Sequence, residues 1–173
     1  MVWSAAVPEE LRSRATAVIG IFPVSQASQY TRLEWLQTFS AGVDAYICPG
    51  VLPRGTMVTN ASGAYGQSVS EHMFATMWAL MKNLNRYASN QRDHQWQDEG
   101  PVLSPEGGIA LIIGVGDIGS HFAQLAQSVG MRTFGVRRHA DVPAKGIEKM
   151  YGFERLETLL PLADVVAMAV PRS

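Results

Sequence analysis

The sequence of 173 residues contains a single cysteine, Cys48, so no disulfide bond can form within the chain. This excludes a small scaffold held together by disulfides and favours a reducing compartment. One cysteine and four scattered histidines give none of the spacings that metal-binding motifs use, so we predict no metal site. We expect Cys48 to be a small buried apolar residue, with a reactive thiol as the alternative.

The sequence also has little net charge and no long apolar run. No stretch approaches the roughly 18 uninterrupted apolar residues of a transmembrane helix, and the opening "MVWSAAVPEELRS" lacks the basic region of a secretory signal. A formal net charge of −1 argues against a surface for nucleic acid or anionic membranes. Because 47% of the residues are hydrophobic, we predict a globular, cytoplasmic protein with no nucleic-acid or membrane partner.

Strand-like and helix-like segments alternate from residue 109 onward. The segment "IALII" predicts a buried strand, and the residues after it predict a helix that ends at Gly130, a typical helix stop. Further strands are predicted at "TFGV", "EKMY" and "DVVAMAV", with a helix in "FERLETLLPLA". This alternation predicts an α/β fold with a doubly wound parallel sheet of the Rossmann type.

The first half of the chain has three shorter strand-like segments, within residues 15–23, 33–36 and 57–59. A loop rich in Ser, Asn and Gly follows over residues 60–67, and we place a domain boundary there. The longest predicted helix begins near Ser70, with Ser68 or Ser70 as its N-cap. Its apolar stripe is predicted to comprise Met73, Met77, Leu80, Leu84, Tyr87 and Ala88, extended by Phe74 and Met81.

Directly after "IALII" comes "GVGDIG", residues 114–119, which fits the pattern G-x-G-x-x-G. At this place Gly114 permits a tight turn, Gly116 lets the backbone approach a pyrophosphate, and Gly119 allows close packing of the helix on the strand. The N–H groups at the helix start, which include those of Asp117 and Ile118, attract phosphates. We therefore predict a dinucleotide site; the alternative is a glycine-rich turn needed only for packing.

A pair of arginines follows the second strand of this half. A site for NAD usually carries an acid there, which binds the ribose 2′-hydroxyl. Counted from the glycines, the place holds Arg137, followed by Arg138. Arginine neutralises a 2′-phosphate through charge-assisted hydrogen bonds. The pair therefore favours NADP, with NAD as the second choice; the alternative is a solvated pair at a strand end.

Four segments together resemble the D-isomer-specific 2-hydroxyacid dehydrogenase family, and the resemblance covers nearly the whole chain. They are "LEWLQTFSAGVD", "VTNASGAYGQSVSEHMFATMWALMKNLNRY", "GVGDIG" and "LPLADVVAMAVP". The first two, at their distance ahead of the glycine turn, are more specific than the turn alone. Within the family, a site that favours NADP is similar to that of the glyoxylate/hydroxypyruvate reductases.

The resemblance implies a two-domain oxidoreductase, a homodimer at full length, that transfers a hydride between NAD(P)H and a 2-keto or 2-hydroxy acid. Residues 1–67 would form part of a flavodoxin-like substrate domain, and residues 68–173 an incomplete Rossmann-type domain that begins with an interdomain and dimer helix. The family binds the substrate carboxylate through backbone N–H groups of a loop, a typical anion-binding nest. Pro171 matches a loop beside the adenosine half of the cofactor, and the carboxylate loop corresponds to Ser40, Ala41, Gly42 and Val43.

The resemblance also implies that no catalytic residue is present. The family's catalytic arginine, glutamate and histidine come from segments after the strand that ends at Val170, and the four histidines here match no catalytic position. We therefore expect an internal fragment, lacking the family's first strand and helix, that is inactive by itself. The alternative is a short, non-catalytic protein of the same fold that binds a nucleotide or a partner. The sequence does not indicate which 2-hydroxy acid is used.

Overall fold

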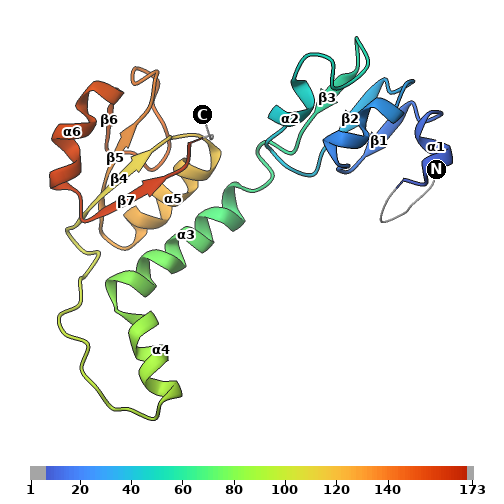
Figure 1. Cartoon of the computed structure of the whole chain (residues 1–173). Coiled ribbons are helices and arrows are strands. Elements are labelled where there is room, and N and C mark those ends of the chain that lie inside the picture. Colours follow the sequence, from blue (N-terminus) through green and yellow to red (C-terminus); the bar gives the residue numbers. More distant parts are fainter. Residues whose placement is uncertain (1–6, 171–173) are drawn as a thin grey trace. The chain divides into compact units, whose positions relative to one another are not determined.

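The computed structural model describes residues 7–170 and divides the chain into two compact units, Met1–Ala64 and Tyr65–Ser173 (Figure 1). Each unit contains one sheet, and every strand pair in both sheets is parallel. The boundary in the structure, between Ala64 and Tyr65, lies slightly earlier than the expected one. The boundary expected after residue 67 falls within the first turn of α3 (Gly66–Met81). Among residues 7–170, no helix has the length and apolar character needed to cross a bilayer.

The first unit is built on a three-stranded sheet with the order β1-β2-β3. The middle residues of the strands, Val18, Leu36 and Val58, are paired and share one face. On this face Val18 and Leu36 belong to a core with Phe22, Tyr30 and Tyr46. The elements of this unit are α1 (Glu9–Arg12), β1 (Ala17–Ile19), the 3-10 helix η1 (Val24–Gln29), β2 (Trp35–Gln37), α2 (Asp44–Ile47) and β3 (Met57–Thr59).

The second unit carries a four-stranded sheet with the order β6-β5-β4-β7. From α3 the chain continues through α4 (Leu84–Arg92) and a long segment to the first strand, β4. Strands and helices then alternate as the sequence predicts. Their bounds are β4 (Ile109–Ile113), α5 (Asp117–Ser128), β5 (Arg132–Val136), β6 (Lys149–Tyr151), α6 (Leu156–Leu159) between short 3-10 turns (Phe153–Arg155 and Leu160–Leu162), and β7 (Val165–Met168).

Both faces of this sheet are covered, which is the doubly wound arrangement that the alternation of strands and helices predicts. Alternate residues of β4 point to opposite faces. Ala110 and Ile112 pack with α3 and α5, where the core includes Met77, Met81 and Phe122. On the opposite face, Leu111 and Ile113 pack with side chains of β5 and with Leu159 of α6. The Rossmann-type α/β prediction is confirmed for this unit.

The long helix differs from its prediction in three respects. It begins at Gly66, with Tyr65 as its N-cap residue and no side-chain cap, so neither Ser68 nor Ser70 caps it. It ends at Met81, because Asn83 takes the left-handed conformation (φ 53°) before α4 begins. Its buried positions include Met77 and Met81, whereas four residues of the predicted stripe are exposed: Leu80, Leu84, Tyr87 and Ala88.

Cys48 is exposed, so the expectation of a buried residue is wrong. It follows α2, in which Tyr46 is buried in the core of the first unit, whereas Ile47 is exposed. The Sγ of Cys48 lies 3.3 Å from the carbonyl oxygen of Asp44.

Candidate functional site

The glycine turn at residues 114–116 lies at the carboxyl end of β4, where the winding of the sheet reverses. From β4 the chain passes through α5 to β5 on one side, while β7 pairs with β4 on the other side (Figure 1). In open α/β sheets this switch point is the place where ligands bind. The turn is fixed from both sides: the N–H of Gly114 donates to the carbonyl of Val136 at 2.9 Å, and the N–H of Ala169 donates to the carbonyl of Ile113 at 2.8 Å.

The three glycines of the turn have different surroundings. Gly114 has φ +90°, and a β-carbon there would lie 2.5 Å from the carbonyl oxygen of Ala169. A β-carbon on Gly119 would overlap the carbonyl oxygen of Gly114. Both positions therefore need glycine for the fold itself. At Gly116, by contrast, φ is −98° and no heavy atom lies within 4 Å of the β-carbon position, so the space beside this residue is open.

Within residues 7–170, backbone N–H groups without a backbone acceptor lie at the start of α5, next to the open space beside Gly116. Gly116 is the N-cap residue of α5, and no side chain caps this helix. The first N–H of the helix with a backbone acceptor is that of Ser120, which donates to the carbonyl of Gly116 at 3.0 Å. The N–H groups of Asp117, Ile118 and Gly119 precede it and have no acceptor within the helix. A helix start with free donors and room beside a glycine fits the pyrophosphate of a dinucleotide.

The side chain of Asp117 is directed at α3. A β-carbon on Gly66, the first residue of α3, would lie 2.5 Å from the carboxyl carbon of Asp117. The Nδ1 of His121 lies 3.4 Å from the carboxylate Oδ1 of Asp117 and 2.9 Å from its carbonyl oxygen. Asp117 therefore contacts the start of α3 through its carboxylate, and the backbone N–H is the group it offers to a phosphate.

The two arginines after β5 lie in different environments. Arg137 is half-buried, and its guanidinium donates to three backbone carbonyls: that of His139 at 2.9 Å, that of Val115 at 3.3 Å, and that of Val142. Arg138 is exposed, and no hydrogen bond or ion pair joins its guanidinium to another residue among 7–170. Pro171, the remaining residue predicted to border the cofactor, lies outside the described residues.

The predicted carboxylate loop belongs to the first unit and follows β2. Its carbonyl groups are held by side chains and by backbone N–H groups. Thr38 Oγ1 and the N–H of Ala61 donate to the carbonyl of Ser40, at 2.8 and 3.1 Å. Asn60 Nδ2 donates to the carbonyl of Ala41 at 2.7 Å, and Ser40 Oγ donates to that of Gly42 at 2.8 Å.

The N–H groups of this loop have no such partners. Within the part of the chain that the structure describes, none of the N–H groups from Ser40 to Val43 donates a hydrogen bond. Sequence reasoning missed Thr38 and Asn60, which hold the loop. Both are polar residues near the end of a predicted strand-like segment, and they directly follow β2 and β3 in the structure; this position is a signal that could have found them.

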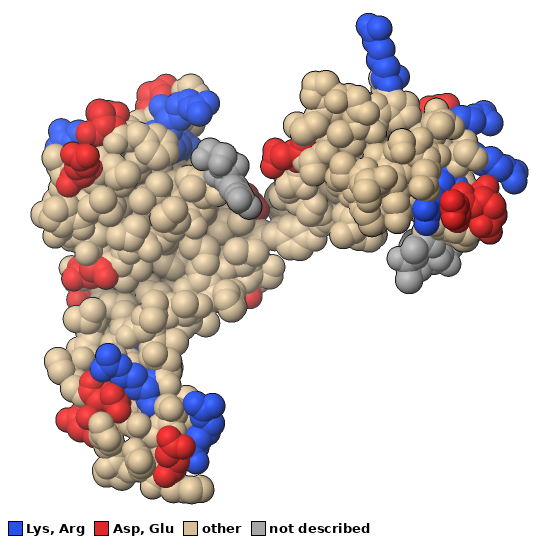
Figure 2. All heavy atoms as spheres, in the orientation of Figure 1, with Lys and Arg blue, Asp and Glu red and all other residues tan. Residues whose placement is uncertain are grey.

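Charged side chains of both signs are interspersed within each unit on the face drawn in Figure 2. One ion pair in the second unit is bidentate: Arg132 donates to Glu148 at 2.7 and 3.1 Å. Arg132 is the first residue of β5, so the pair lies at the end of that strand opposite to Arg137.

Comparison with known proteins identifies several dehydrogenases among the relatives of this chain. Residues 74–173 match the family model described as "D-isomer specific 2-hydroxyacid dehydrogenase, NAD binding domain". A glycerate dehydrogenase of Methylorubrum extorquens is 25% identical over 95% of this chain and 52% of its own length. A D-lactate dehydrogenase of Treponema pallidum is 26% identical over 81% of this chain and 42% of its own length.

A solved structure is similar over the same extent. A D-isomer specific 2-hydroxyacid dehydrogenase family protein of Aeromonas salmonicida superposes with a TM-score of 0.84 and 28% identity, covering 95% of this chain and 53% of that one. The chain thus spans about half the length of the curated relatives it matches.

Proposed function

Because this chain belongs to the D-isomer specific 2-hydroxyacid dehydrogenase family, we propose that it binds a nicotinamide dinucleotide at the glycine turn after β4. We further propose that the whole protein transfers a hydride between this cofactor and a small 2-keto or 2-hydroxy acid. The bound nicotinamide supplies or accepts the hydride. Glycerate and D-lactate, which name two of the relatives, are both small 2-hydroxy acids.

The open space beside Gly116 is the observation that carries the cofactor proposal. Gly114 and Gly119 are needed for packing, and a glycine turn that served only packing would need no glycine at residue 116. A dinucleotide explains the third glycine, since a side chain there would enter the volume of the pyrophosphate. The N–H groups of Asp117, Ile118 and Gly119 would hold the phosphate oxygens, supported by the positive end of the α5 dipole.

The loop from Ser40 to Val43 would hold the carboxylate of the substrate. In a planar trans peptide the carbonyl and the N–H point in opposite directions. Because Asn60 holds the carbonyl of Ala41, the N–H of Gly42 in the same peptide points away from Asn60. The bond from Ser40 Oγ to the carbonyl of Gly42 turns the N–H of Val43 in the same way. Consecutive free N–H groups of this kind bind anions.

NADP is the cofactor that the arginines favour. Arg138 is exposed and has no partner among residues 7–170, so its guanidinium is free to form charge-assisted bonds to a 2′-phosphate. An acidic side chain, which would accept a bond from the free 2′-hydroxyl of NAD, is absent from residues 137–140. A cytoplasmic location stays a prediction from the sequence.

A homodimer would use the exposed apolar surface of α3, α4 and the segment of residues 94–103 that returns from α4. Leu80, Leu84 and Leu103 are each at least half exposed, and Trp96 is fully exposed. Apolar side chains of this size at a surface indicate a protein contact. We propose a second copy of this chain as the occupant.

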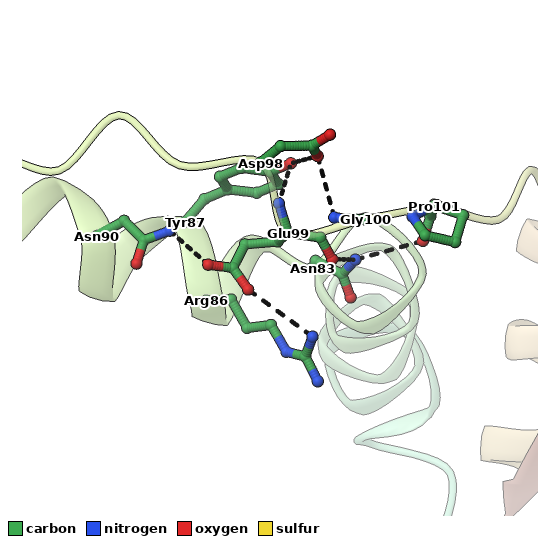
Figure 3. Close-up of polar contacts among 8 residues, drawn as sticks. All are labelled: Asn83, Arg86, Tyr87, Asn90, Asp98, Glu99, Gly100 and Pro101. Carbon is green, nitrogen blue, oxygen red and sulfur yellow. Dashed lines mark hydrogen bonds and ion pairs between the residues drawn. The ribbon is translucent and has the colours of Figure 1, made fainter.

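Polar contacts hold the returning segment against α4, as Figure 3 shows. Asn90 Nδ2 donates to the Glu99 carboxylate at 2.6 Å, and Arg86 lies 3.7 Å from its other oxygen. The N–H of Glu99 donates to the hydroxyl of Tyr87 at 3.2 Å, and Asn83 Nδ2 donates to the carbonyl of Glu99 at 3.3 Å. A surface that is ordered before association loses less conformational freedom on binding, which supports the dimer proposal.

The test of the proposed reaction is oxidation of NADPH by the whole protein with a panel of small 2-keto acids, followed by the loss of dihydronicotinamide absorbance. We expect turnover with at least one 2-keto acid and none with the matched ketones that lack a carboxylate. Asn60→Ala should raise KM more than it lowers kcat, because it loosens the carboxylate loop. Binding of NADPH without turnover of any 2-keto acid would instead support a non-catalytic nucleotide-binding protein.

A further inference from the structure

We propose that Arg137 is a positioning residue that ties the glycine turn to the loop after β5, and that direct recognition of a 2′-phosphate falls to Arg138 alone. The inference rests on the proposed dinucleotide site and divides between two residues a role that the sequence assigns to both. The observation that supports it is that the guanidinium of Arg137 already donates hydrogen bonds to backbone carbonyls.

The guanidinium of Arg137 lies between three backbone carbonyls from two parts of the chain. Its Nε donates to His139 at 2.9 Å and one Nη donates to Val142, both in the loop after β5. The other Nη donates to Val115 at 3.3 Å, in the middle of the glycine turn. These bonds use three of the five N–H groups of the fork. Arg137 thus has most of its donors directed at backbone of its own unit.

The contact with Val115 orients the peptide that precedes Gly116. The carbonyl of Val115 and the N–H of Gly116 belong to one trans peptide and point in opposite directions. Arg137 holds this carbonyl, so the N–H of Gly116 is directed away from the guanidinium. The orientation of the donor next to the open space is therefore set by an arginine that lies 22 residues after Val115.

The contacts with His139 and Val142 fix the backbone on the far side of Arg138. On its near side, the N–H of Arg137 donates to the carbonyl of Tyr151 at 3.1 Å. Arg138 thus lies between two anchored stretches of backbone, while its own side chain is exposed and without a partner in the described part of the chain. A free guanidinium on a fixed loop suits recognition of a phosphate, because less freedom is lost on binding.

The two roles differ in what they predict for NADH, which lacks the 2′-phosphate. A residue that contacts the 2′-phosphate affects NADPH alone. A residue that orients the glycine turn affects NADH and NADPH by the same factor, since both carry the pyrophosphate. Lysine separates the roles further: it keeps the charge and binds phosphate as a point charge, but a single ammonium cannot replace a planar fork across three carbonyls.

The experiment measures the Kd of NADH and of NADPH by calorimetry for the wild-type chain, Arg137→Lys and Arg137→Gln. We expect both variants to weaken both cofactors by a similar factor of about ten, the size of one lost charge-assisted bond, with their ratio unchanged. Two outcomes overturn the inference: a loss confined to NADPH, which makes Arg137 a 2′-phosphate contact, and an unchanged Kd for both cofactors.

A matched control removes the arginine at the start of β5, whereas Arg137 follows the end of this strand. Arg132→Gln breaks the pair with Glu148 at the opposite end of β5 and should leave both Kd values unchanged. The melting temperatures of all variants are recorded, and a loss of affinity as large in Arg132→Gln as in Arg137→Lys would mean that general loosening of the unit causes it, which overturns the inference. If the wild-type chain binds neither cofactor, the proposed function fails, and the inference that rests on it is overturned with it.

Discussion

The carbonyl oxygen of Gly114 occupies the position that a β-carbon on residue 119 would need. This contact joins the first glycine of the turn to the last one and brings α5 against the end of β4. It agrees with the separate roles that the sequence predicts for two glycines of the motif: Gly119 is required for packing, whereas Gly116 borders open space.

Gly119→Ala should therefore destabilise the second unit. The new methyl group would meet the Gly114 carbonyl and, at 3.2 Å, Cγ2 of Ile112, and such overpacking costs about 1–3 kcal/mol of unfolding free energy. Denaturant unfolding measures the loss. Gly116→Ala is the matched control and should stay within about 1 kcal/mol of the wild type, the cost of alanine at an N-cap. Equal stability of the two variants would contradict the assignment.

Arg138→Gln should lower the preference for NADPH over NADH. The exposed guanidinium is the free donor near the end of β5, and a charge-assisted bond to phosphate contributes about 1.5–3 kcal/mol. We expect the ratio of the two Kd values to change by roughly tenfold to a hundredfold in favour of NADH. A wild-type chain that prefers NADH, or an unchanged ratio in the variant, would make Arg138 an ordinary surface residue.

The pair of Arg132 and Glu148 should give a small pH dependence of stability. The hydrogen bond from Arg132 is the main cause that lowers the pKa of Glu148 in the folded state. A carboxyl group with a lowered folded pKa contributes stability above its unfolded pKa and loses it as the pH falls through the folded pKa. Wild type should therefore be more stable than Glu148→Gln at neutral pH, and the difference should close below about pH 4, near the ordinary pKa of glutamate. A difference that persists at low pH would exclude this cause.

Leu84→Glu should weaken self-association. Leu84 is 50% exposed on the surface proposed for a second copy, and a carboxylate buried there would lack a partner. Sedimentation of the wild-type chain should show a dimer that the variant shifts toward monomer. Ile47→Glu, at an apolar residue that is 61% exposed in the first unit, is the matched control and should leave the dimer intact. A wild type that stays monomeric at all concentrations would refute the proposed interface.

The sequence predicts the sheet of the second unit closely because each signal there is local. The predicted strand "IALII" coincides with β4, since an uninterrupted apolar run between glycines has few alternatives. The positions of Gly114 and Gly119 are likewise predictable, because backbone sterics alone demand glycine there.

Features that depend on distant contacts could not be predicted in this way. The helix breaks at Asn83, whose side chain binds the carbonyls of Glu99 and Pro101 in a later segment. The stripe that includes Leu84 looks like a core face in the sequence, but the chain turns before that residue. Arg137 is of a residue type that often binds phosphate. Only the folded structure shows that its guanidinium already donates hydrogen bonds to backbone carbonyls.

Calorimetric titration of NADH and NADPH into the wild-type chain and into Gly116→Val tests the central claim most directly. We expect the wild-type chain to bind at least one of the two cofactors. Gly116→Val should show no binding heat yet keep a cooperative unfolding transition within about 2 kcal/mol of the wild type, because its side chain enters only the open space and its remaining cost is that of a poor N-cap residue. Unchanged affinity in Gly116→Val would contradict the account, since the space beside Gly116 would then not be where the cofactor's pyrophosphate binds.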